Sequence, residues 1–356
     1  MRVLITGTDG YIGCLMAPVL MRAGHDVVGL DTRYFSDARL GEEPARGYPT
    51  IDKDLRHVTR ADLEGFDAVV HLAGLSNDAL GAISSAVTYA VNYTASTRLA
   101  ELAREAGVSR FVYSSSCSVY GRSDAEIVSE DSPVNPQTDY ARCKVLDEID
   151  MAKLACDSFS PTFLRNATAY GASPRMRFDL VVNNLSGCAY TTGRIAMVSD
   201  GTPWRPIVHV LDICEAFRAA LAAPREAVHN KVFNVGRSDE NFRIREIAEI
   251  VAETFPGCEV TFGASDPDQR SYRVSFDRIT RELPGFQCAW DLRRGVAELR
   301  ELYERARMSG DQFRFRAFTR LRQLKHLMDE GQLDADFFWT SAAAARPEPA
   351  LSTPAR

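Results

Sequence analysis

The stretch Val3-Leu4-Ile5-Thr6-Gly7-Thr8-Asp9-Gly10-Tyr11-Ile12-Gly13 lies at the start of the chain and decides the fold. Its first four residues are apolar or β-branched, as in a buried strand, and three glycines spaced by three follow. Glycines in this pattern allow a tight turn, close approach of the backbone to a pyrophosphate, and close packing of the next helix on the strand. The first turn of that helix directs free N–H groups at the phosphates. The stretch therefore predicts a strand, a phosphate-binding turn and a helix.

Strand-like and helix-like segments alternate through the first half of the chain. The apolar runs are continuous, which is typical of parallel strands that are covered on both faces. The alternation predicts an α/β fold with a doubly wound parallel sheet. We expect strands at Val3–Thr6, Asp26–Asp31, Ala68–Leu72, Phe111–Ser115 and Pro161–Arg165, and helices at Tyr11–Arg22, Val87–Ala106 and Tyr140–Cys156.

The second half of the chain is less regular and predicts a smaller lobe. We expect residues 1–165 to form the main domain and residues 166–310 the smaller lobe, with some later elements returning to the main sheet. Residues 311–340 are expected to form a helical C-terminal extension. Residues 341–356, mostly Ala and Pro with few large apolar groups, are expected to be disordered. The expected helices are Phe178–Tyr190, Val210–Ala222, Phe242–Thr254, Val296–Arg307 and Gln312–Met328, and the expected strands lie near Ile195–Val198, Val232–Val235 and Glu259–Phe262.

Composition and charge narrow the function classes. The chain has 356 residues with a formal net charge of -6, which argues against an extended surface for nucleic acid. No apolar run reaches the roughly 18 residues of a membrane span, and the N-terminus lacks the apolar stretch of a signal peptide. The eight cysteines show no Cys-x-x-Cys pair and no metal-ligand spacing, so we expect buried thiols and no metal site. These features predict a cytoplasmic protein.

The end of the second predicted strand carries the residue that selects the cofactor. Asp31 can accept hydrogen bonds from the ribose hydroxyls of adenosine and repels a 2′-phosphate, which favours NAD over NADP. Arg33, two residues later, is the residue that could instead hold a 2′-phosphate. The pattern predicts NAD as the cofactor.

A tyrosine and a lysine one helical turn apart are the candidate catalytic pair. Tyr140 and Lys144 share one face of a predicted helix. A neighbouring ammonium favours the phenolate form of a tyrosine, which can then take a proton from a hydroxyl. The run Tyr113-Ser114-Ser115-Ser116-Cys117-Ser118 follows a buried strand, at the sheet edge where such folds bind ligands. Its hydroxyls are expected to orient a substrate.

Together these motifs resemble the extended short-chain dehydrogenase/reductase family, and specifically its nucleotide-sugar epimerase/dehydratase branch. The resemblance extends from residue 1 to about residue 300. It implies a Rossmann-type domain with a smaller C-terminal substrate-binding lobe, a permanently bound NAD, a nucleotide-diphosphate-sugar substrate, and a homodimer formed through Val87–Ala106 and Tyr140–Cys156. The motifs are the glycine triplet, Asp31, His71-Leu72-Ala73-Gly74, Asn92, the serine run before Val119-Tyr120-Gly121, and Tyr140-x-x-x-Lys144.

The resemblance also implies roles for individual residues. Tyr140 would be the base, Lys144 would hold the nicotinamide ribose, and Ser116 would be the assisting hydroxyl. The other implied cofactor-binding residues are Gly7, Gly10, Tyr11, Ile12, Gly13, Asp31, Arg33, Asp54, Leu55, Leu72, Ala73, Gly74, Asn92, Ser114 and Ser115. The implied substrate-binding residues are Ser76, Thr168, Asn184, Leu185, Arg205 and Arg270, with the two arginines as diphosphate ligands.

The reaction itself is narrowed by the residues after Ser116. The 4,6-dehydratases of this branch carry an Asp-Glu pair where this chain has Cys117 and Ser118, so we expect 4-epimerisation through a transient 4-keto sugar. Relatives with a catalytic Cys carry it one position later, so Cys117 is either an acid/base or a packed thiol. A dehydratase or an NAD(P)H-dependent ketoreductase remains the alternative. A non-catalytic NAD sensor is a minor alternative, since such proteins usually lack the Tyr or the Lys.

Overall fold

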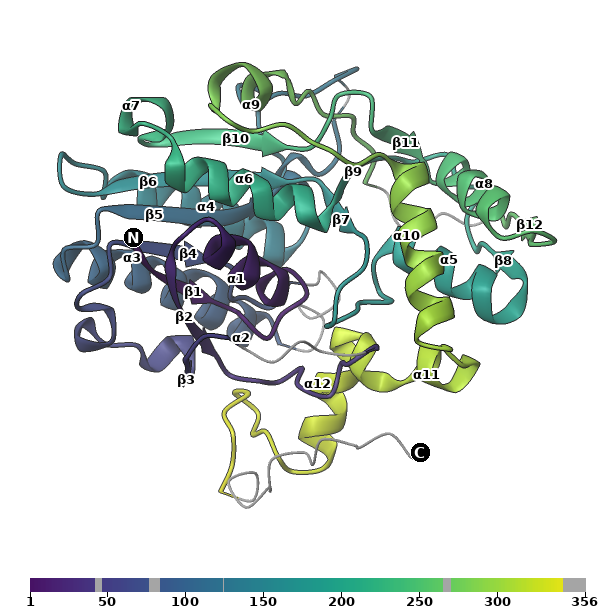
Figure 1. Ribbon diagram of the computed structural model, residues 1–356, viewed down its shortest axis with the longest axis horizontal. Helices are drawn as coiled ribbons and strands as arrows, with labels where there is room; N and C mark the ends of the chain where they lie inside the picture. The colour runs from purple at the N-terminus through teal and green to yellow at the C-terminus, as the bar shows by residue number, and fades with distance from the viewer. Residues whose placement is uncertain (42–46, 77–83, 124, 265–269, 342–356) are drawn as a thin grey trace.

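A seven-stranded parallel sheet forms the centre of the molecule (Figure 1). The computed structural model describes residues 1–41, 47–76, 84–123, 125–264 and 270–341. Neighbouring strands pair in the order β10-β6-β5-β4-β1-β2-β3, which confirms the doubly wound, Rossmann-type α/β fold. The strands are β1 (Arg2–Thr6), β2 (Asp26–Asp31), β3 (Thr50–Asp52), β4 (Ala68–His71), β5 (Arg110–Ser116), β6 (Ser160–Asn166) and β10 (Lys231–Val235).

Both faces of the sheet are covered by helices, which explains the continuous apolar runs. In β1, Val3 and Ile5 pack with helices α1 (Gly13–Arg22) and α6 (Val210–Ala222). Leu4 points to the other face and belongs to the core cluster that includes residues of α3 (Ala95–Glu105) and α4 (Asp139–Ala152). Successive strand residues thus enter different cores, and both cores need apolar side chains.

The helix expected at Val87–Ala106 is built from three pieces. α2 (Ser85–Tyr89) passes into a π-helical turn, Ala90–Thr94, and then into α3. Such turns locally displace side chains and often occur near functional sites. Here the π-helical turn contains Asn92, whose side-chain amide binds both the backbone N–H and the carbonyl of Leu75, at 2.7 and 3.1 Å.

The second half of the chain forms two small sheets and the helices around them. β7 (Thr168–Tyr170), β9 (Trp204–His209) and β11 (Asn241–Arg243) form one sheet, and β8 (Arg194–Ala196) pairs with β12 (Glu259–Thr261). The predicted helix Phe242–Thr254 starts too early, because Phe242 pairs with Arg205 in the β11–β9 ladder. The remaining helices here are α5 (Val181–Thr192), α7 (Arg225–Val228), α8 (Ile244–Thr254), α9 (Asp277–Glu282) and α10 (Leu292–Arg305).

The predicted helix Gln312–Met328 is wrong as a single element. The chain forms α11 (Gly310–Arg314), a short 3-10 turn at Arg316–Phe318, and α12 (Arg320–Asp329). The break lies at Phe315, whose ψ of 131° is extended rather than helical. The predicted disorder of residues 341–356 falls, apart from Ser341, outside the described residues. None of the helices in the described ranges has both the length and the apolar run that crossing a membrane requires.

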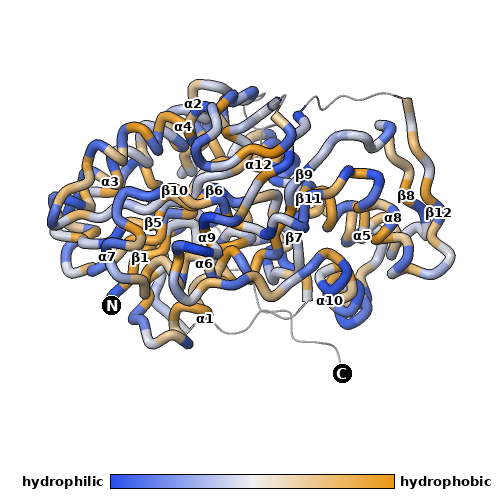
Figure 2. Tube along the Cα trace, turned by 90° about the horizontal axis from the view of Figure 1, so that it is seen from above, coloured by the Kyte–Doolittle hydropathy of each residue, from blue (hydrophilic) through white to orange (hydrophobic). Residues whose placement is uncertain are grey.

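The C-terminal segment Arg320–Trp339 packs against the first half of the chain. Leu324 and Leu327 of α12 are buried in a cluster with Tyr34 and Leu75. In the hydropathy view, α12 lies beside the central sheet rather than over β8 and β12 (Figure 2). Tyr34 follows β2 and Leu75 follows β4. The segment therefore covers the carboxyl ends of these two strands.

We expect Leu324→Ala to lower the free energy of unfolding by about 2–5 kcal/mol, because it opens a cavity in this cluster. Urea unfolding followed by circular dichroism measures the loss. Lys325→Ala, at the exposed neighbouring position, is the control and should change stability by less than about 0.5 kcal/mol. Equal stability of the two variants would mean that α12 does not pack as described.

Candidate active site

A cavity of about 1180 Å³ lies along the carboxyl ends of the central strands and continues between the two halves of the chain. Its walls come from the segments that follow β1, β2, β4, β5 and β6, and from residues of α5, β9 and α12. The volume exceeds the roughly 300–1,000 Å³ that is usual for one small ligand. The cavity therefore has room for two ligands side by side.

The glycine turn forms one end of this cavity, and its geometry requires glycine. Gly7 has φ +80°, and a Cβ atom there would lie 2.8 Å from the backbone N of Ala73. A Cβ atom on Gly13 would lie 2.0 Å from the Gly7 carbonyl oxygen. Gly10, Tyr11 and Ile12 line the cavity between these two positions, where α1 starts. The cradle fits a diphosphate that approaches the backbone and the free N–H groups of the helix.

The carboxylate of Asp31 lies at the cavity and is held by the backbone. It accepts the N–H of Asp9 at 2.8 Å and the N–H of Arg33 at 2.7 Å. The Arg33 guanidinium turns to Asp52, with an N–O distance of 2.7 Å, and the residue is absent from the described cavity lining. Asp31 therefore lines the cavity where the sequence predicts the adenosine ribose, whereas the Arg33 guanidinium is paired with Asp52 and lies 3.9 Å from Asp9.

Most of the other expected cofactor-binding residues also line the cavity. Asn92 does not, and its amide instead fixes the backbone of Leu75, so it can act on a ligand only through that loop. The lining members of the expected set are Asp54, Leu55, Leu72, Ala73, Gly74, Ser114, Ser115, Tyr140 and Lys144, and the expected substrate residue Ser76 lines the cavity beside them.

Lys144 is fixed beneath the ring of Tyr140. The Thr138 hydroxyl caps the N-terminus of α4, so both residues lie in its first two turns. The Lys144 ammonium donates to the Ser114 carbonyl at 2.7 Å and to the Tyr113 hydroxyl at 3.0 Å. It lies 5.5 Å from the centroid of the Tyr140 ring. A cation at this distance stabilises a phenolate on the tyrosine.

A buried carboxylate, Asp147, shares the Tyr113 hydroxyl with this lysine as a hydrogen-bond partner. Asp147 accepts a short hydrogen bond from the hydroxyl of Tyr113, the same group that receives the Lys144 ammonium. Burial lowers the pKa of Lys144, and the charge of Asp147 opposes that shift. Burial raises the pKa of Asp147, and the charge of Lys144 opposes that shift in turn. Each group thus helps the other to remain charged inside the protein.

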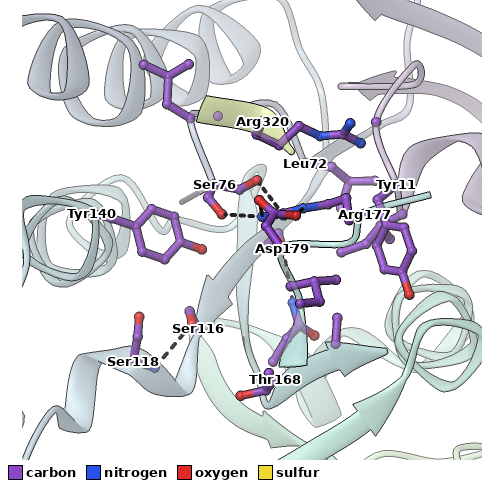
Figure 3. Close-up of a pocket in the computed structure, with 18 of the residues that line it drawn as sticks. Tyr11, Leu72, Ser76, Ser116, Ser118, Tyr140, Thr168, Arg177, Asp179 and Arg320 are labelled. Atoms are coloured by element: carbon purple, nitrogen blue, oxygen red, sulfur yellow. Dashed lines mark hydrogen bonds and ion pairs between the residues drawn. The ribbon is translucent and has the colours of Figure 1, made fainter. Parts of the chain in front are cut away.

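Three polar side chains face Tyr140 across the cavity. Figure 3 shows the Tyr140 hydroxyl directed into the same space as Ser116, Ser118 and Thr168. Ser116 accepts the N–H of Ser118 at 3.1 Å, which leaves its O–H free to donate. The Ser118 hydroxyl is buried and has no hydrogen-bond partner among the described residues. Such a group is a ready partner for a substrate hydroxyl.

Cys117 points away from this space, unlike the two serines around it. It is 1% exposed, lies outside the described cavity lining, and its thiol donates to the Arg165 carbonyl at 3.1 Å. Burial raises the pKa of the Cys117 thiol well above its usual range. Of the two roles expected for Cys117, this placement favours the packed thiol.

The far end of the cavity carries the expected substrate residues, with one exception. Arg205 on β9 donates to the backbone carbonyls of Trp204 and Arg270, and both arginines line the cavity together with Asn184 and Thr168. Leu185 is buried in the apolar core beside Tyr11 and does not line the cavity within the described part of the chain. Its side chain packs α5 rather than facing a ligand.

Three charged residues in the middle of the cavity were not predicted from the sequence. Arg177 donates to the Ser76 hydroxyl at 3.0 Å and pairs with Asp179, also at 3.0 Å. Arg320 of α12 lines the same region. Arg177 and Asp179 lie in a stretch of alternating charged and apolar residues after β7, which could have indicated a ligand-facing segment. No local pattern distinguishes Arg320 from the exposed Arg322.

Comparisons with known proteins agree with this geometry. The model of the NAD dependent epimerase/dehydratase family matches residues 3–236. A UDP-glucose 4-epimerase of Mycolicibacterium smegmatis is 30% identical, over 85% of this chain and 98% of that protein. The solved structure of MoeE5 with UDP-glucose and NAD is 28% identical, with a TM-score of 0.73 over 86% of this chain and all of that one. DesIV of Streptomyces venezuelae, a dTDP-glucose 4,6-dehydratase at 23% identity and a TM-score of 0.73, shares the fold.

The family match covers well over half of the chain, and it includes the glycine turn, Asp31, the serine run and the Tyr140/Lys144 pair. The chain belongs to the NAD dependent epimerase/dehydratase family.

Proposed function

We propose that this protein is an NAD-dependent nucleotide-sugar epimerase that inverts C4 of the sugar through a transient 4-keto sugar. The observation that carries the proposal is the arrangement around Tyr140, where Lys144 and the hydroxyls of Ser116, Ser118 and Thr168 are brought together. Such a set can move a proton and orient a sugar. Relatives named UDP-glucose 4-epimerase, at 26–30% identity, support the same activity.

Each residue has a definite task in this reaction. NAD, held by the glycine turn and Asp31, would supply the hydride acceptor and donor for the sugar carbon. Tyr140, as a phenolate stabilised by the Lys144 ammonium, takes the proton of the C4 hydroxyl and becomes a neutral phenol, which returns the proton when the keto group is reduced. Ser116 and Ser118 hold the reacting oxygen by hydrogen bonds. Arg205 and Arg270 bind the diphosphate of the substrate, so that the sugar can rotate while its nucleotide remains fixed.

Elimination of water would require an acid beside the sugar, and the described lining of the cavity holds no carboxylic acid in a suitable form. Two of the carboxylates in the described lining lie at the adenosine end, where Asp31 ends β2 and Asp54 follows β3. The third, Asp179, is held by two hydrogen bonds from Arg177. Burial raises the pKa of Asp179, but the charge and hydrogen bonds of Arg177 bring it below its usual value. This favours epimerisation over dehydration.

The proposal includes NAD rather than NADP, because Asp31 faces the cavity and Arg33 is engaged by Asp52. It also includes a nucleotide-diphosphate sugar as substrate, in line with the UDP-glucose in the MoeE5 structure. The homodimer and the cytoplasmic location stay predictions.

Product analysis tests the proposal directly. Purified protein is incubated with NAD and a panel of UDP-, dTDP-, GDP- and CDP-sugars, and the products are analysed by mass spectrometry and NMR. We expect an isomer of unchanged mass, inverted at C4, and no net NADH. A product that has lost one water would contradict the proposal, and so would a stoichiometric oxidation or reduction.

Tyr140→Phe is expected to lower kcat by about 10²–10⁴-fold, since the phenol supplies the proton transfer. NAD binding, followed by calorimetry, should remain. Tyr93→Phe is the matched control, because the Tyr93 hydroxyl binds Asp150 outside the cavity and its loss should leave kcat unchanged. Full activity of Tyr140→Phe would exclude this base.

The variants Ser118→Ala and Cys117→Ala distinguish the catalytic contributions of these two neighbouring side chains. The serine variant should lose about 3- to 10-fold in kcat/KM, the equivalent of one hydrogen bond of about 0.5–1.5 kcal/mol. The cysteine variant should keep the activity of the wild type, because its thiol lies in the core. The reverse order, in variants shown by circular dichroism to be folded, would assign the acid/base role to Cys117.

A further inference from the structure

The C-terminal segment Arg320–Trp339 packs against residues that line the cofactor end of the cavity, and it contributes Arg320 to the described lining. Tyr34 donates to the Phe337 carbonyl at 2.5 Å, Gln323 donates to the Tyr34 carbonyl at 3.1 Å, and Trp339 donates to the Thr32 carbonyl at 2.7 Å. Thr32, Tyr34 and Phe35 all line the cavity directly after Asp31. The family model ends at residue 236, so the segment that supports this wall lies outside the family match.

Arg320, the first residue of α12, brings a buried positive charge to this wall. It is 3% exposed, yet it lines the cavity, with its guanidinium 4.3 Å from the centroid of the Phe35 ring. Two of its N–H groups donate to the backbone carbonyls of Ala317 and Arg175, at 3.1 and 3.3 Å. Its remaining N–H groups are available to a ligand.

Two neighbouring arginines form ion pairs with carboxylates, whereas Arg320 has no such partner among the described residues. Arg175 pairs with Asp9 at 3.3 Å, and Arg177 pairs with Asp179 at 3.0 Å. Burial, together with the charge of Arg177, lowers the pKa of Arg320 to about 9. The charge of Asp179 opposes this shift without reversing it. Arg320 is therefore a buried cation that the described carboxylates neutralise only in part, which indicates that an anion completes the site.

The surroundings of Arg320 indicate which anion this is. The Arg175 backbone binds Arg320, while the Arg175 side chain reaches Asp9 inside the glycine turn. Arg177 beside it binds Ser76, just after the Leu72–Gly74 loop. Figure 3 shows Arg320 on the same side of the cavity as Leu72 and Arg177, away from Thr168. These contacts lie around the ends of β1 and β4, where the dinucleotide diphosphate crosses the sheet.

We propose that Arg320 binds the diphosphate of the dinucleotide cofactor, so that the C-terminal segment Arg320–Trp339 completes the cofactor site. The inference rests on the proposed function only in that the cofactor is NAD. The glycine turn then offers backbone N–H groups to the diphosphate, and Arg320 adds a charged, water-shielded hydrogen bond. The diphosphate of the nucleotide sugar is the competing ligand, but it has its own arginines, Arg205 and Arg270, at the other end of the cavity.

The test is ligand binding without turnover, measured by calorimetry on the full chain freed of bound nucleotide. We compare the Kd values of NAD, ADP-ribose, adenosine and UDP for the wild type, Arg320→Met and Arg320→Lys. Loss of a charge-assisted hydrogen bond should weaken NAD and ADP-ribose by about 10- to 100-fold in Arg320→Met and by less in Arg320→Lys. Adenosine and UDP should bind as in the wild type. Arg322→Met, exposed on the same helix, is the matched control and should change none of the four.

Two results would overturn the proposal. One is unchanged affinity for NAD and ADP-ribose in Arg320→Met, and the other is a loss confined to UDP, which would assign Arg320 to the substrate. If Arg320→Met does not fold, a crystal structure of the wild type with ADP-ribose decides: the guanidinium must lie within hydrogen-bonding distance of a phosphate oxygen. Because no catalysis is measured, a wild type that binds NAD but epimerises no sugar would refute the proposed function and leave this proposal intact.

Discussion

The close approach of helix α1 to strand β1 is the constraint on which the rest of the site depends. No side chain fits at Gly13, where a Cβ atom would lie 2.0 Å from the Gly7 carbonyl oxygen. This contact places the N-terminus of α1 at the carboxyl end of the sheet, next to Asp31 and the loop after β4. The position of the cofactor, and hence of the carbon that reacts beside it, follows from that contact.

The catalytic pair is brought to the same edge by a second set of contacts. α4 lies against β5 and β6, and the Lys144 ammonium is fixed by the Ser114 carbonyl and the Tyr113 hydroxyl. Asp147, which accepts a hydrogen bond from Tyr113, raises the pKa of Lys144 and so favours the charged form of this buried side chain. These contacts thus hold the Lys144 ammonium under Tyr140, at the end of the sheet where the glycine turn binds the cofactor. Neither set of contacts would support hydride transfer without the other.

The sequence allowed prediction of those features whose conformation depends on residues that are close together in the chain. The glycine turn, the parallel strands and the Tyr140/Lys144 spacing depend on backbone geometry and helical period, which short stretches carry. The break at Phe315 and the opposite orientations of Cys117 and Ser118 could not be predicted, because they depend on distant packing partners. The same is true of Arg320: its burial comes from Phe35 and Arg175, which are far from it in sequence.

The central claim is that the hydride leaves C4 of the sugar and returns to the same carbon on the other face. The most direct measurement uses the nucleotide sugar that the protein accepts, labelled with deuterium at C4, and follows the label by NMR and mass spectrometry. The account predicts an inverted sugar that keeps its deuterium at C4, with none released to water. Loss of the label to solvent, or its appearance at another carbon, would contradict it.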